Sequence, residues 1–144
     1  MAVSLRPLLL LLVAVALSAV SAARAEIAVV VNPESGVTEM TRDQVVNIYM
    51  GRYQGLPSGI TAFPVDLVPL RQDFYSRLVD RTLAEINSYW ARLIFSGRAT
   101  PPRRLDDATA VLEVVSNNRG AIGYLPSGAV DDSRVTVVLE LVDD

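Results

Sequence analysis

Short apolar blocks separated by turn residues predict an alternation of strands and helices along this chain. Residues 27–31 are continuously apolar and mostly β-branched, which is typical of a strand buried on both faces. The turn cluster at 32–36, with its Asn, Pro, Ser and Gly, ends that strand. Further strands are predicted at 60–65, 121–125 and 135–141.

Four stretches between these strands have the periodicity of amphipathic helices. Thr41 and Thr82 each open a stretch that has the S/T-x-x-E/Q form of a capping box. Pro69 suits the first turn of another helix, and Asp106 or Asp107 suits the N-cap of the last one. The order β-α-β-α-α-α-β-β predicts an α/β fold, a three-layer sandwich with a mostly parallel central sheet.

The first 25 residues have the features of a secretory signal peptide. Arg6 precedes the apolar run 8–20, which is shorter than the ~20 residues needed to span a bilayer. Ala23-Arg24-Ala25 forms a small-residue cleavage site, so a single domain is predicted over 26–144. We therefore expect a periplasmic protein without a membrane anchor after cleavage. An uncleaved N-terminal anchor is the alternative.

The amino-acid composition excludes several kinds of catalytic and metal site. All 13 basic residues are arginines, and the chain has no lysine, histidine or cysteine. Catalytic triads with histidine, zinc sites of His and Cys, and disulfides are therefore excluded. Sixteen acidic residues give a net charge of −3, too acidic for an electrostatic nucleic-acid binder. No carboxylate pair adjoins a nucleophile, and we expect neither an enzyme nor a bound metal or cofactor.

Several fragments in order resemble the solute-binding protein of the phosphate ABC transporter, a type II periplasmic binding protein. Residues 29–32 (VVVN) are similar to that family's crossing strand, and 48–52 (IYMGR) to its "IFLGK" helix end. Residues 60–66 followed by Phe74-Tyr75 resemble the strand and helix that flank its phosphate loop. Tyr89-Trp90 matches the family's tryptophan segment, and 120–124 (GAIGY) its "GAIGYV" strand. The agreement runs from about residue 27 to residue 125.

The resemblance implies one lobe of such a receptor, because the family has two lobes that close on the ligand. In the family, an arginine, a short spacer and Ser-Gly-Thr at a helix start hold the phosphate. Here the corresponding stretch is 65–72, where Asp66 replaces the arginine and the Ser-Gly-Thr part is apolar. A carboxylate repels phosphate, so the resemblance implies a degenerate phosphate loop with at most weak binding of a small anion.

Five residues are candidate ligand-binding residues. Leu70 and Arg71 lie in the first turn of a helix, where amide groups and a guanidinium attract an anion, and Asp66 precedes them. Asn32 and Ser35 follow the carboxyl end of a strand, where open α/β sheets place ligands. Alternatively, Asp66 caps the helix and Arg71 is a surface residue, while the 32–36 segment is a plain turn.

Two functions follow from these observations. The first is an exported, non-enzymatic binding module for a small inorganic anion such as phosphate, with an ABC transporter permease or another envelope protein as its partner. The second is a periplasmic scaffold or sensory partner protein that has lost ligand binding. The sequence also leaves open whether the strand at 135–141 pairs within the chain or with another copy.

Overall fold

Residues 26–143 are described by the computed structural model of the chain, so the predicted signal peptide lies outside the described residues. The sheet has five strands in the order β3-β2-β4-β1-β5. These are β1 (Ile27–Val31), β2 (Phe63–Leu67), β3 (Arg103–Leu105), β4 (Ala121–Pro126) and β5 (Thr136–Leu141).

The strand directions confirm the predicted, mostly parallel sheet. β2 pairs in parallel with both β3 and β4, whereas β1 is antiparallel to β4 and β5. Four strands therefore run in one direction, and only β1 opposes them. β5 pairs with β1 of the same chain, which answers the question that the sequence left open.

Four helices surround this sheet: α2 (Arg42–Tyr49), α3 (Arg71–Val79), α4 (Leu83–Phe95) and α5 (Ala108–Asn117). Both predicted capping boxes are present, at Thr41 before α2 and at Thr82 before α4. At the start of α5 it is Asp107, not Asp106, that caps the helix, by accepting a hydrogen bond from the amide of Ala110 at 2.8 Å. Two single-turn 3₁₀ helices, η1 (Val68–Leu70) and η2 (Ser127–Ala129), follow β2 and β4.

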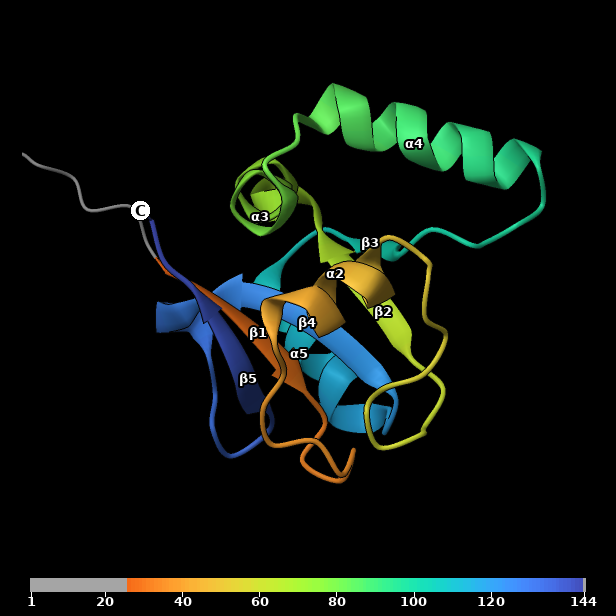
Figure 1. Ribbon diagram of the computed structural model, residues 1–144. Helices are drawn as coiled ribbons and strands as arrows, with labels where there is room; N and C mark the ends of the chain where they lie inside the picture. Colours follow the sequence, from red (N-terminus) through yellow and green to blue (C-terminus); the bar gives the residue numbers. More distant parts are fainter. Residues whose placement is uncertain (1–25, 144) are drawn as a thin grey trace, which may run out of the picture.

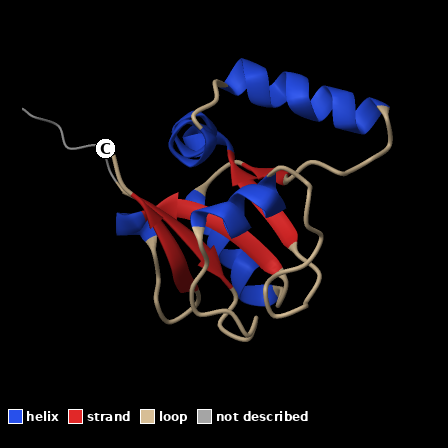
Figure 2. Ribbon diagram, in the orientation of Figure 1, coloured by secondary structure: helices blue, strands red, loops and turns tan. Residues whose placement is uncertain are grey.

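The helices form layers on both faces of the sheet (Figures 1 and 2). α5 covers one face and α2 lies over the other, while α3 and α4 lie at the end of the sheet where β2 finishes. α5 approaches β4 closely over Gly123, where a Cβ atom would lie 2.9 Å from Val111 and 3.0 Å from Val65. Burial of the apolar side chains of all five strands and their covering helices supplies the core.

Two details of the strand prediction are wrong. The second strand begins at Phe63 rather than at residue 60, because the preceding residues fold back on themselves. The amide of Leu56 binds the carbonyl of Ile60, and that of Ala62 binds the carbonyl of Gln54, each at 2.8 Å. The prediction also missed β3, a three-residue edge strand whose two arginines are exposed and give it no apolar pattern.

The approach of residue 120 to the loop before β2 yields a stability prediction. A Cβ atom on Gly120 would lie 2.1 Å from the carbonyl oxygen of Thr61, which is backbone and cannot rotate away. We expect Gly120→Ala to lower the free energy of unfolding by about 3 kcal/mol. In the control Gly128→Ala the new methyl group meets no atom within 4 Å, so a change within about 0.5 kcal/mol is expected. Urea unfolding followed by circular dichroism measures both, and equal stabilities would contradict the close approach.

Candidate functional site

The candidate site is built around the carboxylate of Asp66, which is inside the protein. Asp66 is the fourth residue of β2, and only 1% of its surface is exposed. Its Oδ1 atom accepts hydrogen bonds from the hydroxyls of Tyr75 and Tyr124, both at 2.9 Å. Its Oδ2 atom accepts a hydrogen bond from Nε of Arg71 at 3.1 Å. We call these four residues the Asp66 cluster.

Arg71 is the first residue of α3, and the helix directs its side chain inward. The residue is 6% exposed, and its guanidinium carbon lies 5.7 Å from the centre of the Tyr75 ring. A second nitrogen, Nη2, donates to the side-chain oxygen of Asn87 on α4 at 3.2 Å. Arg71 therefore links the end of β2 to both α3 and α4.

The alternative in which Asp66 caps the helix and Arg71 is a surface residue is wrong. Neither η1 nor α3 has a side-chain cap, and Arg71 is buried. The amide of Arg71 donates to the carbonyl of Val68, so it is already used within η1. Leu70 is the N-cap residue of α3 and is half-buried. The structure therefore brings the side chains of Asp66 and Arg71 together.

A cluster of aromatic rings encloses the carboxylate. The rings of Phe74 and Tyr124 stack with centroids 3.6 Å apart, and Tyr49 meets the edge of Phe74 at 4.8 Å. The hydroxyl of Tyr49 donates a hydrogen bond to the backbone carbonyl of Val65 on β2, at 2.9 Å. Both Tyr49 and Tyr124 are fully buried. Their hydroxyls remain satisfied because each meets an acceptor inside the protein.

Burial and hydrogen bonding act on the pKa of Asp66 in opposite directions. Desolvation raises the pKa above its ordinary value of 3.8, because the charged form loses contact with water. The hydroxyls of Tyr75 and Tyr124 and the guanidinium of Arg71 lower it, but they do not cancel the effect of burial. Burial and the nearby carboxylate also raise the pKa values of Tyr75 and Tyr124, which keeps both hydroxyls protonated as donors.

A pocket of about 360 Å³ adjoins the Asp66 cluster, between α4 and the segment that leads into β3. Asp66, Arg71 and Asn87 form its polar side, and Trp90 and Pro102 are among its apolar residues. Arg104 also lines the pocket, because the register of the parallel β2–β3 pair places it beside Asp66. The sequence did not point to Tyr75, Tyr124, Asn87 or Arg104 as site residues. Only Tyr75 had a local signal, since it lies one helical turn after Arg71.

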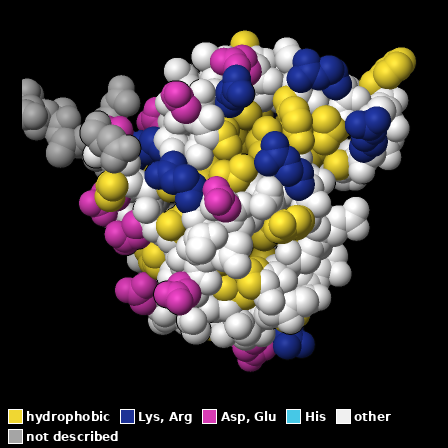
Figure 3. Space-filling view, viewed as in Figure 1, with side chains coloured by type: hydrophobic (Ala, Val, Ile, Leu, Met, Phe, Trp, Pro, Cys, Tyr) yellow, Lys and Arg dark blue, Asp and Glu magenta, His cyan; other side chains and the backbone are white. Residues whose placement is uncertain are grey.

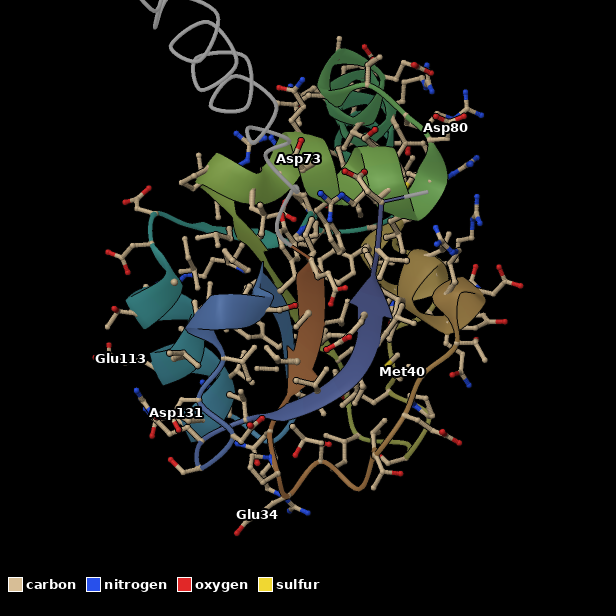
Figure 4. The ribbon with its side chains drawn as sticks, turned by 90° about the vertical axis from the view of Figure 1, so that its left-hand side faces the viewer. Glu34, Met40, Asp73, Asp80, Glu113 and Asp131 are labelled. Atoms are coloured by element: carbon tan, nitrogen blue, oxygen red, sulfur yellow. The ribbon has the colours of Figure 1, made fainter. Side chains whose placement is uncertain are left out.

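Asn32 and Ser35 do not join this site. The antiparallel pairing of β1 with β4 takes the chain away from the end of the sheet where β2 finishes. Figure 4 shows Glu34 at the opposite end of the molecule from Asp73 on α3. The side-chain Nδ2 atom of Asn32 donates to the carbonyls of Val115 and Ser116 in the last turn of α5, at 2.9 and 3.0 Å. The Ser35 hydroxyl accepts from the amide of Val37 at 3.2 Å. Asn32 thus joins the end of β1 to α5, and the Ser35 contact lies within the turn that follows β1.

Within residues 26–143, no group of three or more acidic side chains lies close enough together to hold a metal ion. None of the helices in this range is long and apolar enough to cross a bilayer.

The Asp66 cluster leads to a prediction about pH and stability. The raised pKa means that the folded state keeps the Asp66 proton longer than the unfolded state, so ionisation of Asp66 lowers the free energy of unfolding as pH rises above about 3.8. Tyr124→Phe removes a donor that lowers this pKa. We expect the variant to lose about 1 kcal/mol while Asp66 is protonated and about 2–3 kcal/mol at pH 7, where the lost bond is to a charge.

Urea unfolding across pH 3.5 to 7 measures this difference. The control Tyr53→Phe alters a hydroxyl on a residue that is 57% exposed, and it should change stability little at any pH. A loss in Tyr124→Phe that stays constant with pH would show that the hydroxyl does not act on the carboxylate.

The fold is similar to that of known proteins, although the sequence matches none of them closely. No protein-family model matches this sequence, and no curated protein does so either. Similar solved structures include an ABC-type phosphate transport receptor from Vibrio cholerae (20% identity, TM-score 0.53) and a putative phosphate ABC transporter substrate-binding protein with bound phosphate from Clostridium perfringens (22%, 0.62). A possible phosphate binding protein from Planctomyces limnophilus is also similar (14%, 0.55).

These matches cover 81%, 81% and 85% of this chain, and 47%, 46% and 43% of the three structures. The chain therefore spans a little under half the length of the proteins that it resembles. At these identities the likeness shows the fold, which is the fold of a periplasmic-binding-protein lobe.

Proposed function

We propose that this chain is an exported, non-enzymatic module of the solute-binding-protein kind, with a degenerate phosphate loop and at most weak binding of a small anion such as phosphate. The shared fold supports this proposal, since the similar structures are phosphate transport or phosphate-binding proteins and one of them holds phosphate. The sequence from residue 65 to 72, with its aspartate and apolar residues, supports the loss of strong binding.

One observation carries the proposal: the chain's own carboxylate already occupies a set of anion-binding donors. A guanidinium and two hydroxyls donate to Asp66, and these are the groups that bind phosphate oxygens in proteins. A phosphate at the same place meets repulsion from Asp66 and has to displace hydrogen bonds that are already made. The internal carboxylate therefore acts in place of an external anion.

Weak binding remains feasible at the edge of the Asp66 pocket. Arg104 is exposed there, and Arg71 also lines the pocket. A lobe of this kind offers the anion an open surface, unless a second lobe, from another copy or a partner, covers it. An ABC transporter permease or another envelope protein is the corresponding protein partner in this proposal.

Enzymatic activity is not part of this proposal, because the chemistry of the site is incomplete. Asp66 is the only fully buried carboxylate among residues 26–143, and three donors use its oxygens. General acid–base catalysis needs a carboxyl group that can exchange its proton with a reacting group, and usually a second group with a different pKa. Location in the periplasm rests on the signal peptide that the sequence predicts.

Isothermal titration calorimetry with phosphate and sulfate tests the binding proposal. We expect millimolar dissociation constants for the protein, and about tenfold tighter phosphate binding in Asp66→Asn, which removes the repelling charge. Glu113→Gln removes the same charge from an exposed position on α5 and should leave the binding unchanged. Micromolar binding of phosphate by the unmodified protein would contradict a degenerate loop. The absence of heat at millimolar phosphate, with an unchanged melting temperature, would contradict residual binding.

A second candidate function is the scaffold or sensory partner, and one observation favours it. Phe95, at the end of α4, is 96% exposed, and its neighbour Ile94 is 54% exposed. Large apolar side chains exposed together at the end of a helix are a common feature of protein contact sites.

Native mass spectrometry of protein purified from a periplasmic extract tests this second function. A specific partner retained with the protein, lost in Phe95→Ser and kept in the control Tyr53→Ser, is the expected result. The protein free of partners in all three preparations would contradict it.

A further inference from the structure

A groove on the opposite flank of α4 from the Asp66 pocket has the character of a second binding site. It has a volume of about 540 Å³ and lies between the end of α2 and α4. Arg52, Arg81 and Arg92 line it, and its apolar residues are Met50, Ala84, Ile86 and Tyr89. We call it the arginine groove. Figure 3 shows this face, with yellow apolar side chains between α4 and α2 and dark blue basic side chains around them.

We propose that the arginine groove binds an organic polyanion, a molecule with two or three carboxylate or phosphate groups on an apolar body. This inference does not rest on the proposed function, because it uses none of the residues of the Asp66 cluster.

The three arginines converge from separate parts of the chain. Arg52 follows α2, Arg81 lies between α3 and α4, and Arg92 is in the last turn of α4. The acidic residue at the groove is Glu85, which pairs with Arg81 at 3.0 Å and also completes the capping box of α4. One carboxylate against three guanidinium groups leaves the groove with a net charge of +2. This charge contrasts with the net charge of −3 of the whole chain.

Two of these guanidinium groups have donors to spare for a ligand. Arg52 makes one long hydrogen bond, from Nη1 to the side-chain oxygen of Asn47 at 3.4 Å. Within residues 26–143, the guanidinium of Arg92 makes no hydrogen bond or ion pair. Each guanidinium carries five N–H donors in a planar fork that matches carboxylate and phosphate oxygens. The groove therefore offers oxyanions more donors than the protein itself uses.

The two walls of the groove are held together by specific contacts. The hydroxyl of Tyr89 on α4 donates to the carbonyl of Met50, at the end of α2, at 2.6 Å. Beside it, the chain turns at Gly51, where φ is +72° and a Cβ atom would lie 2.7 Å from the ring of Trp90. Gly51 thus permits both the turn and the close packing of α4 against it. A groove fixed in this way loses little entropy when it binds a ligand.

Size and lining together indicate the class of ligand. A volume of about 540 Å³ lies in the range of small-molecule sites and greatly exceeds what an inorganic phosphate fills. Ile86 and Met50 are buried beneath the groove, and the exposed Ala84 and half-buried Tyr89 give it accessible apolar surface. The three arginines are exposed around this surface. An apolar body can cover it while its charged groups reach the guanidinium groups. A simple inorganic anion makes only the second kind of contact.

Binding of benzene-1,3,5-tricarboxylate, a planar tricarboxylate, tests the proposal with the folded protein in 150 mM NaCl. Calorimetry and amide chemical shifts in two-dimensional NMR measure the affinity and the location. We expect saturable binding with shifts at Ser88 and Tyr89, and about tenfold weaker binding in Arg52→Gln and in Arg92→Gln. Citrate, which has three carboxylates but no apolar ring, and benzoate, which has one carboxylate, should both bind more weakly.

Two control variants separate this site from general charge effects and from the Asp66 pocket. Arg119→Gln removes an exposed arginine outside the groove and should leave the affinity for the tricarboxylate unchanged. Asp66→Asn, which should strengthen phosphate binding, should not affect the tricarboxylate either. Equal weakening by Arg119→Gln and Arg92→Gln, or the absence of shifts at the groove at 10 mM tricarboxylate, would overturn the proposal. Neither result bears on the titration of Asp66→Asn with phosphate, which tests the proposed function separately.

Discussion

The structure depends on one buried electrostatic interaction, the pairing of the Asp66 carboxylate with Arg71, Tyr75 and Tyr124. A carboxylate inside a protein is costly unless its oxygens receive hydrogen bonds, and here one comes from a guanidinium and two from hydroxyls. The donors come from α3 and β4, while the acceptor is on β2. The interaction therefore joins the middle of the sheet to the helix at its end, and it uses donors that could otherwise bind an external anion.

α4 lines both candidate ligand sites. Ile86 and Trp90 are the buried residues of α4, and Asn87 receives a hydrogen bond from Arg71. α4 also contacts the end of α2 through Tyr89, and a pocket lies on each of its flanks. One hollow contains an aspartate that already holds an arginine, and the other contains arginines with few partners. α4 thus lies between a pocket whose charged groups are paired with each other and a groove whose arginines have few partners.

Local patterns predicted most of the elements but few of the contacts of the site. The capping boxes at Thr41 and Thr82 were predicted because a cap is a hydrogen bond between residues three apart in sequence. β3 was missed because an edge strand with exposed arginines needs no apolar alternation. Asp66 and Arg71 were both candidate ligand-binding residues, and the structure pairs them with each other. The alternative, in which Asp66 caps the helix, was wrong, since the partners of Asp66 include Tyr124, 58 residues away.

The sequence by itself determined the α/β architecture, the helix starts and the absence of histidine, cysteine and lysine chemistry, because these depend on composition and on residues close together in the chain. Only the tertiary structure decided that Asp66 is buried, that Asn32 lies away from it, and that three arginines from separate segments share one groove. The reason is physical. Burial, desolvation and the convergence of charges are properties of surfaces that come together only when the helices pack on the sheet.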